Sequence, residues 1–133
     1  MKKKILIVDD DFDLLEQLKA ILVDAGYDVT MAEGRVAAEE ELLKMKPDLA
    51  ITDLMMEERD AGFILSHKIK QLYPGTPLIL LTSVASVTGL SFTAQNPDPR
   101  SWTIVDKIMD KPVRAEQIKE EIRKLLHEAD EVH

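Results

Sequence analysis

Short apolar runs that alternate with amphipathic stretches are the feature that most constrains the fold of this chain. Such runs begin at Ile5, Leu49 and Leu78, and each is followed at once by polar residues. Runs of this kind are typical of parallel strands that are buried on both faces of a sheet. The alternation of strands with helices predicts an α/β fold whose parallel sheet has right-handed crossovers.

This pattern predicts five strands that alternate with helices, and four of the helices have a regular apolar period. We predict the strands at residues 5–8, 27–31, 49–52, 78–81 and 104–109. The helices are predicted where apolar residues recur at helical spacing, at Leu15, Leu18, Leu22 and Ala25, at Ala38, Leu42 and Met45, at Leu65, Ile69 and Leu72, and at Ile118, Ile122, Leu125 and Ala129. Asp11 or the next residue can cap the first helix, and Gly26 is well suited to follow its end.

The stretch from Ser83 to Trp102 differs from the rest of the chain. It contains Gly89, Asn96, Pro97 and Pro99 among many Ser and Thr residues and has no sustained period. This composition favours a loop or a broken helix.

The size and composition indicate one domain, which we expect to span residues 1–133. No apolar run approaches the ~20 residues of a membrane span, and the run after Met-Lys-Lys-Lys is too short for a signal peptide. Because the chain has no cysteine, a cytoplasmic location is expected. The net charge of −8 argues against nucleic-acid binding and is compatible with a site that binds a cation.

Carboxylates gather where two of the strands end. Asp9, Asp10 and Asp11 follow the first strand, and Asp53 follows the third. Ligands of open α/β sheets bind at the carboxyl ends of the strands. Two carboxylates about 4 Å apart repel by ~4 kcal/mol, so either their pKa values rise or a cation lies among them. Oxygen ligands without His or Cys favour Mg²⁺. The aspartate triplet alone is equally compatible with a helix cap in a solvated acidic turn.

Asp53 is more specific, because an acid directly after a buried strand needs a partner. A carboxylate can attack phosphorus and form an aspartyl phosphate. That chemistry needs a metal, a second cation and a hydroxyl donor. Asp10 and Asp53 would bind the metal, Lys111 would be the second cation, and Thr82 would supply the hydroxyl. The simpler alternatives are that Thr82 is an ordinary strand end and that Lys111 is a surface lysine before a turn.

The set formed by Asp9-Asp10, Asp53, Thr82-Ser83 and Lys111-Pro112 resembles the receiver domain of two-component response regulators over essentially the whole chain. The resemblance implies a doubly wound, five-stranded parallel sheet of flavodoxin-like order 2-1-3-4-5. In this chain the composition of Ser83 to Trp102 predicts an irregular or shortened fourth helix. The resemblance further implies a stand-alone signalling phosphoacceptor rather than an enzyme, which assists its own phosphorylation and dephosphorylation. The expected partners are a histidine kinase or phosphotransfer protein and an unidentified downstream protein.

The resemblance also implies a role for each site residue. Asp53 would be the phosphoacceptor. Mg²⁺ would be bound by Asp10, Asp53 and the backbone carbonyl of Met55, with Asp9 reaching it through water. Lys111 would contact the phosphoryl oxygens, and Thr82 would turn to bond one of them.

Several positions depart from the family pattern. Glu57 stands where the family commonly has Pro, and the glycine of the Asp-Gly pair comes one residue late, at Gly62. Ile108 occupies a switch position that is usually aromatic in the family. The Lys111–Pro112 bond, in contrast, is expected to follow the family and be cis. The stretch between Thr82 and Lys111 is longer than usual. We therefore expect a different loop path after Asp53 and an unusual output surface.

Two rival functions remain open. One is a phosphorylation-independent interaction module, favoured by Ile108 and by the altered loop after Asp53. The other is a Mg²⁺-dependent phosphatase with an aspartyl nucleophile, against which Met55 stands where a second acid would be needed. Met55 is also a candidate for limiting the access of water to an aspartyl phosphate.

Overall fold

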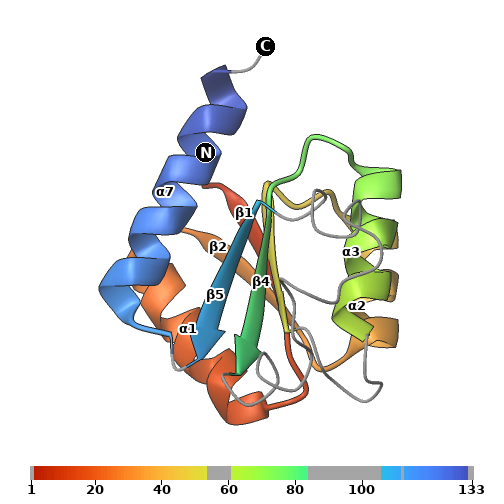
Figure 1. The fold of residues 1–133 in the computed structure, drawn as a ribbon, viewed down its shortest axis with the longest axis horizontal. Helices are drawn as coiled ribbons and strands as arrows, with labels where there is room; N and C mark the ends of the chain where they lie inside the picture. Colours follow the sequence, from red (N-terminus) through yellow and green to blue (C-terminus); the bar gives the residue numbers. More distant parts are fainter. Residues whose placement is uncertain (1, 54–60, 84–105, 112, 132–133) are drawn as a thin grey trace, which may run out of the picture.

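A central parallel sheet organises the computed structural model, which describes residues 2–53, 61–83, 106–111 and 113–131 (Figure 1). The strands of this sheet are β1 (Lys4–Val8), β2 (Asp28–Ala32), β3 (Leu49–Asp53), β4 (Leu78–Ser83) and β5 (Lys107–Lys111). The helices in the described residues are α1 (Phe12–Asp24), α2 (Arg35–Lys44), α3 (Ala61–Leu72) and α7 (Ala115–Glu131).

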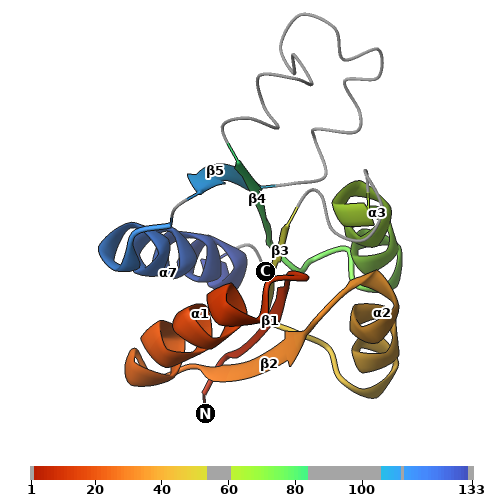
Figure 2. The same ribbon diagram turned by 90° about the horizontal axis from the view of Figure 1, so that it is seen from below.

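The strand order is β2-β1-β3-β4-β5, and all four neighbouring pairs are parallel. This confirms the predicted doubly wound α/β fold and its order. Helices α1 and α7 cover one face of the sheet, and α2 and α3 cover the other (Figure 2). The expected broken helix or loop after Ser83 lies outside the described residues.

Alternate residues of the central strands supply the two halves of the core, because successive side chains of a strand leave opposite faces. On β1, Ile5 and Ile7 join the cluster under α1 and α7, whereas Leu6 and Val8 join the cluster under α2 and α3. The strand is therefore buried on both faces, as its continuous apolar run predicted.

The last two strand predictions were wrong at their ends. The predicted fourth strand stopped at Leu81 and the predicted fifth at Met109, but β4 continues to Ser83 and β5 to Lys111. Backbone pairing explains the difference, since Thr82 is the register partner of Asp110 and Ser83 that of Lys111. Polar side chains ended the apolar pattern, but they did not end the hydrogen-bonded ladder.

The capping predictions for α1 are confirmed. The Asp11 carboxylate accepts a hydrogen bond from the backbone N–H of Leu14 at 3.3 Å. At the other end, Gly26 has φ +99° and donates its N–H to the carbonyl of Val23, while Tyr27 donates to that of Leu22. This pair of bonds is a Schellman motif, which favours glycine.

In the described ranges, no helix is long and apolar enough to cross a membrane.

Candidate functional site

Strand alternation brings three charged residues to one face of the sheet at its carboxyl edge. Asp9 follows β1 directly, Asp53 is the last residue of β3, and Lys111 is the last residue of β5. The residues two positions before them all belong to the core cluster under α1 and α7 (Ile7, Ile51 and Met109). Since a strand repeats every second residue, the three charged side chains continue that same face.

Lys111 is the cation at the centre of this group. Its Nζ lies 2.9 Å from Oδ2 of Asp9 and 3.2 Å from Oδ1 of Asp53. The other oxygen of Asp9 accepts a hydrogen bond of 2.9 Å from the backbone N–H of Asp11. Asp9 is thus fixed on both sides and anchors the ammonium group beside Asp53. The alternative of Lys111 as an ordinary surface lysine is not what the geometry shows.

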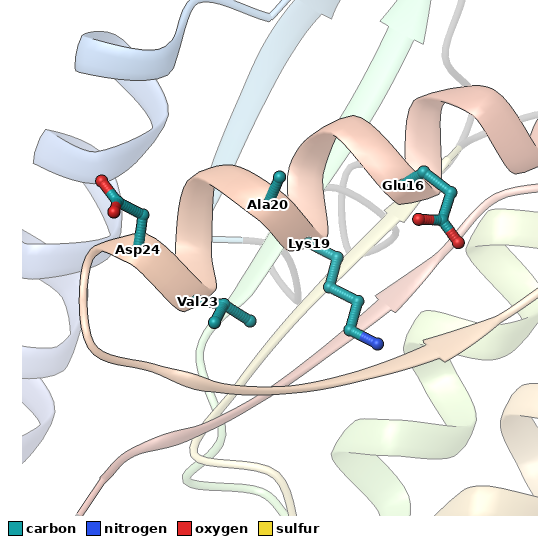
Figure 3. A pocket seen from close by; sticks show the side chains of 5 residues that line it. All are labelled: Glu16, Lys19, Ala20, Val23 and Asp24. Atoms are coloured by element: carbon teal, nitrogen blue, oxygen red, sulfur yellow. The ribbon is translucent and has the colours of Figure 1, made fainter.

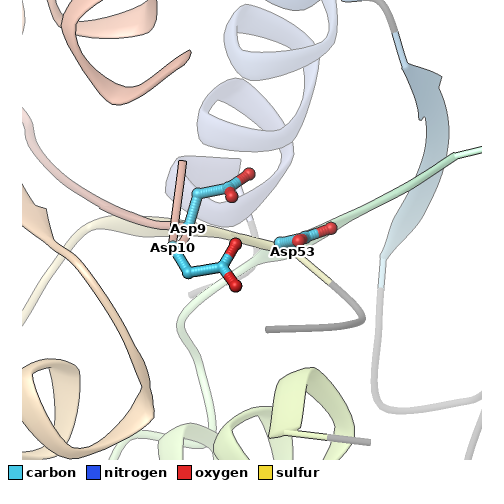
Figure 4. A group of neighbouring side chains, drawn as sticks. All are labelled: Asp9, Asp10 and Asp53. Carbon is cyan, nitrogen blue, oxygen red and sulfur yellow. The ribbon is translucent and has the colours of Figure 1, made fainter. Parts of the chain in front are cut away.

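Asp9, Asp10 and Asp53 form a candidate cation site. Each offers one carboxylate oxygen, and these oxygens all lie within 4.8 Å of one another (Figure 4). Asp9 and Asp53 expose 1% and 6% of their surface, whereas Asp10 is exposed. Among the described residues, three carboxylates against the ammonium of Lys111 leave an excess of negative charge. A donor set of oxygens only, open to solvent on the Asp10 side, fits Mg²⁺.

The pKa directions show that this excess charge is poorly tolerated. Burial, and then the charge of Asp9, raise the pKa of Asp53 to about 6 despite the attraction of Lys111. Burial and the neighbouring Asp9 also raise the pKa of Asp10. For Lys111, burial favours the neutral amine, but its hydrogen bond to Asp9 and the charges of Asp53 and Asp9 outweigh burial and raise the pKa. A divalent cation among the carboxylates would relieve this repulsion.

Thr82 lies at the same edge on β4, the strand between β3 and β5. It is buried and comes one residue after Leu81, the register partner of Asp53. Alternation therefore directs its side chain to the opposite face of the sheet from that of Asp53. Its expected turn toward a phosphoryl group stays a prediction. Met55 and the Lys111–Pro112 bond, also predicted from the sequence, involve residues outside the described ranges.

The sequence did not predict the contact between Asp9 and Lys111. Asp9 had been assigned only an indirect role at a metal, yet it is the carboxylate closest to the ammonium group. The available clue was its even spacing from Ile5 and Ile7, which places Asp9 on the face of Asp53 and Lys111. A separate hollow along α1, lined by Glu16, Lys19, Ala20, Val23 and Asp24, contains none of the predicted site residues (Figure 3).

Residues 5–123 match the family model described as the response regulator receiver domain. The chain belongs to this family. The match confirms the resemblance drawn from the site residues. Receiver domains are signalling phosphoacceptors of two-component systems. One relative, the response regulator receiver protein CpdR of Brucella abortus, is 32% identical over 127 residues, which are 93% of this chain and 97% of CpdR.

Other relatives are much longer than this chain. The transcriptional regulatory protein GlrR of Escherichia coli is 41% identical over 83 residues, which are 62% of this chain but only 18% of GlrR. Among solved structures, a CheY-like receiver domain protein from Methanospirillum hungatei has a TM-score of 0.85 at 29% identity and is covered completely, as is this chain. TrrA from Thermotoga maritima, in complex with Mg(2+)-BeF, has a TM-score of 0.74 at 28% identity, over 92% of this chain and 98% of TrrA.

Proposed function

We propose that this chain is a phosphoacceptor switch of a two-component phosphorelay, phosphorylated on Asp53 by a histidine kinase or a phosphotransfer protein. The observation that carries the proposal is the environment of the Asp53 carboxylate. It is nearly buried at the carboxyl edge of the sheet and, in the described part of the chain, has one ammonium group and two further carboxylates beside it. Its position at a strand end keeps the reacting oxygen at the edge where ligands of such sheets bind.

In the proposed reaction, an oxygen of Asp53 attacks the phosphorus of a phosphohistidine. The new O–P bond forms as the P–N bond breaks, and the departing imidazole nitrogen takes a proton from solvent. The carboxylate must be ionised to attack, and with a pKa of about 6 Asp53 is mostly ionised at neutral pH. Lys111 then exchanges its contact with Asp53 for a phosphoryl oxygen, while Asp9 retains the ammonium group.

We propose that Mg²⁺ is the cofactor, with Asp10, Asp53 and the backbone carbonyl of Met55 as direct ligands. Asp9 would bind it through water. When bound, it neutralises charge on the phosphoryl oxygens. Support comes from the converging carboxylate oxygens of Asp9, Asp10 and Asp53. The complex of the related TrrA with Mg(2+)-BeF adds support from outside this chain.

We propose that output passes through contacts with a downstream protein rather than with nucleic acid or a membrane. Phosphorylation can shift the domain only as far as the phosphoryl contacts differ between its two states. Lys111 and Thr82 are the residues whose contacts would change. In this proposal residues 1–133 act as a single receiver domain.

The test is intact-protein mass spectrometry after incubation with acetyl phosphate or a phosphorylated histidine phosphotransfer domain, with and without Mg²⁺. Wild type and Asp24→Asn, the same substitution at an exposed aspartate at the far end of α1, should each gain one phosphoryl group when Mg²⁺ is present. Asp53→Asn should gain none. A folded wild type that takes no phosphoryl group from either donor would refute the proposal, and partner binding that survives Asp53→Asn would favour the interaction module.

A further inference from the structure

Two aspartates make the same pair of hydrogen bonds at the amino edge of the sheet. The carboxylate of Asp106 accepts the backbone N–H of Leu78 at 2.7 Å, and the Asp106 N–H donates to the Leu78 carbonyl at 2.9 Å. Asp48 makes both bonds with Lys4, each at 2.7 Å. Asp48 directly precedes β3 and Asp106 directly precedes β5. These are the two strands that end in Asp53 and Lys111.

Lys70 joins the Asp106 pair to the helix layer. Its Nζ donates to the carbonyl of Thr76 at 2.6 Å and lies 3.4 Å from Oδ2 of Asp106. The carboxylate that accepts from Leu78 is thereby also tied to α3. This network fixes the first residues of β4 and β5 relative to each other, at the opposite edge of the sheet from the phosphoacceptor site.

The apolar pattern of β5 is too weak to set its register alone. The strand Lys-Ile-Met-Asp-Lys has two adjacent apolar residues, of which Met109 is buried and Ile108 is 38% exposed. In the described sheet β5 is an edge strand and pairs with β4 only. A shift by one residue would turn every side chain to the other face. In one direction Ile108 would take the place of Met109, so the core would still receive an apolar residue.

That same shift would destroy the candidate site. Asp110 would occupy the position of Lys111 opposite Ser83, so a carboxylate would replace the ammonium group beside Asp9 and Asp53. The contact of Lys111 with Asp53 cannot be the only safeguard, because the proposed phosphorylation changes that contact. Within the site only the contact of Lys111 with Asp9 would persist through the reaction, so bonds outside the site would hold the register more securely.

We propose that Asp106, supported by Lys70, is a positioning residue that sets the β4–β5 register and so places Lys111 beside the phosphoacceptor. This inference rests on the proposed function. Asp48 provides the contrast, because β3 pairs with both β1 and β4 and all five of its residues are buried. Its register is held on both sides, so loss of the Asp48 bonds should cost stability without moving Asp53.

The experiment compares Asp106→Ala, Asp106→Asn and Asp48→Ala with wild type by backbone NMR. Inter-strand NOEs report the β4–β5 register directly, and NOEs to the Met109 methyl report which residue fills the core. Phosphorylation by acetyl phosphate with Mg²⁺ is measured on the same samples. The NMR readout does not require phosphorylation, so a wild type that fails to react would sink the proposed function while the register is still tested.

We expect Asp106→Ala to lose the Leu81–Met109 and Thr82–Asp110 pairings and to react at least about tenfold more slowly, because small displacements of a catalytic group are costly. Asp106→Asn keeps an oxygen acceptor for Leu78 and should retain both the pairings and the rate, as should Asp48→Ala. Adding Ile108→Thr to Asp106→Ala should restore the native pairings, because the shifted register would bury a polar residue.

Unchanged β4–β5 pairings in Asp106→Ala would overturn the proposal, whether or not the rate falls. Equal slowing in Asp106→Asn and Asp106→Ala would overturn it as well. Lys70→Met leaves both Leu78 bonds in place and covers the case in which Asp106→Ala does not fold. In Lys70→Met we expect a second, minor set of β5 resonances, and a single native set would refute a role for the network in the register.

Discussion

Replacing the Asp53 carboxylate should stabilise the metal-free protein. The pKa of Asp53 is raised from its ordinary 3.8 to about 6, so the folded state holds this proton more tightly than the unfolded state does. Above pH ~6 both states are ionised, and the folded state carries a penalty of about 2 pKa units, or about 3 kcal/mol. Since Asp53 is only 6% exposed, solvent does little to screen this penalty.

The penalty should depend on pH in a defined way. Below the unfolded pKa both states are protonated and the penalty vanishes, so wild-type stability should fall as pH rises from about 4 to about 6 and then level off. Asp53→Asn cannot ionise and escapes the penalty. Its advantage in the free energy of unfolding should approach about 3 kcal/mol at pH 7.5, be about half that at pH 5, and be small at pH 4.

The assay is urea unfolding monitored by circular dichroism, in EDTA and in Mg²⁺, at these three pH values. Mg²⁺ at about 1,000 times its Kd should reverse the order of stability at pH 7.5, because it then adds about 4.1 kcal/mol to the form that binds it. Asp24→Asn, at an exposed position, serves as the control. An Asp53→Asn protein no more stable than wild type in EDTA at pH 7.5, or an advantage independent of pH, would refute the reasoning.

Three further outcomes are expected. Lys111→Met leaves the carboxylates of Asp9 and Asp53 without their counter-charge and should lower the free energy of unfolding in EDTA by roughly 2 kcal/mol, because breaking a partly buried ion pair leaves an unpaired charge. Urea titration would measure the loss, and no loss would contradict the assigned ion pair. Asp10→Asn should weaken Mg²⁺ binding at least about tenfold by calorimetry, and unchanged affinity would remove Asp10 from the ligand set. Gly26→Ala should cost roughly 1 kcal/mol in thermal unfolding, because φ is +99° and a Cβ there would meet no neighbour; Gly75→Ala, equally open but without that φ, should cost less.

Periodicity predicted most of the fold because the strands of this sheet are buried on both faces. The run at residues 5–8 is typical of a strand whose two faces both meet helices. The similar run at residues 49–52 then placed Asp53 at the end of a strand. The same reasoning failed for the end of β5, where Asp110 and Lys111 continue the ladder without an apolar side chain. Backbone pairing leaves no trace in the hydropathy of an edge strand.

The sequence predicted which residues gather at the site, but not which of them are in contact. Adjacent aspartates look alike in the sequence, yet Asp9 is buried against Lys111 while Asp10 is exposed. Only the phase of the strand distinguishes them. The bonds of Asp106 were missed for a different reason: a polar residue before a strand resembles any loop residue until its partner Leu78 is known.

The position of the Asp106 bonds has a consequence for how this chain can tolerate changes in length. Five residues separate Asp106 from Lys111, counting Lys111 itself, and all five are strand. Residues added before Asp106 would lengthen the connection from β4 without changing which atom faces Asp53. One residue inserted after Asp106 would turn the lysine to the other side of the sheet. Engineered or natural insertions should therefore be accepted upstream of Asp106 and rejected within the strand that follows it.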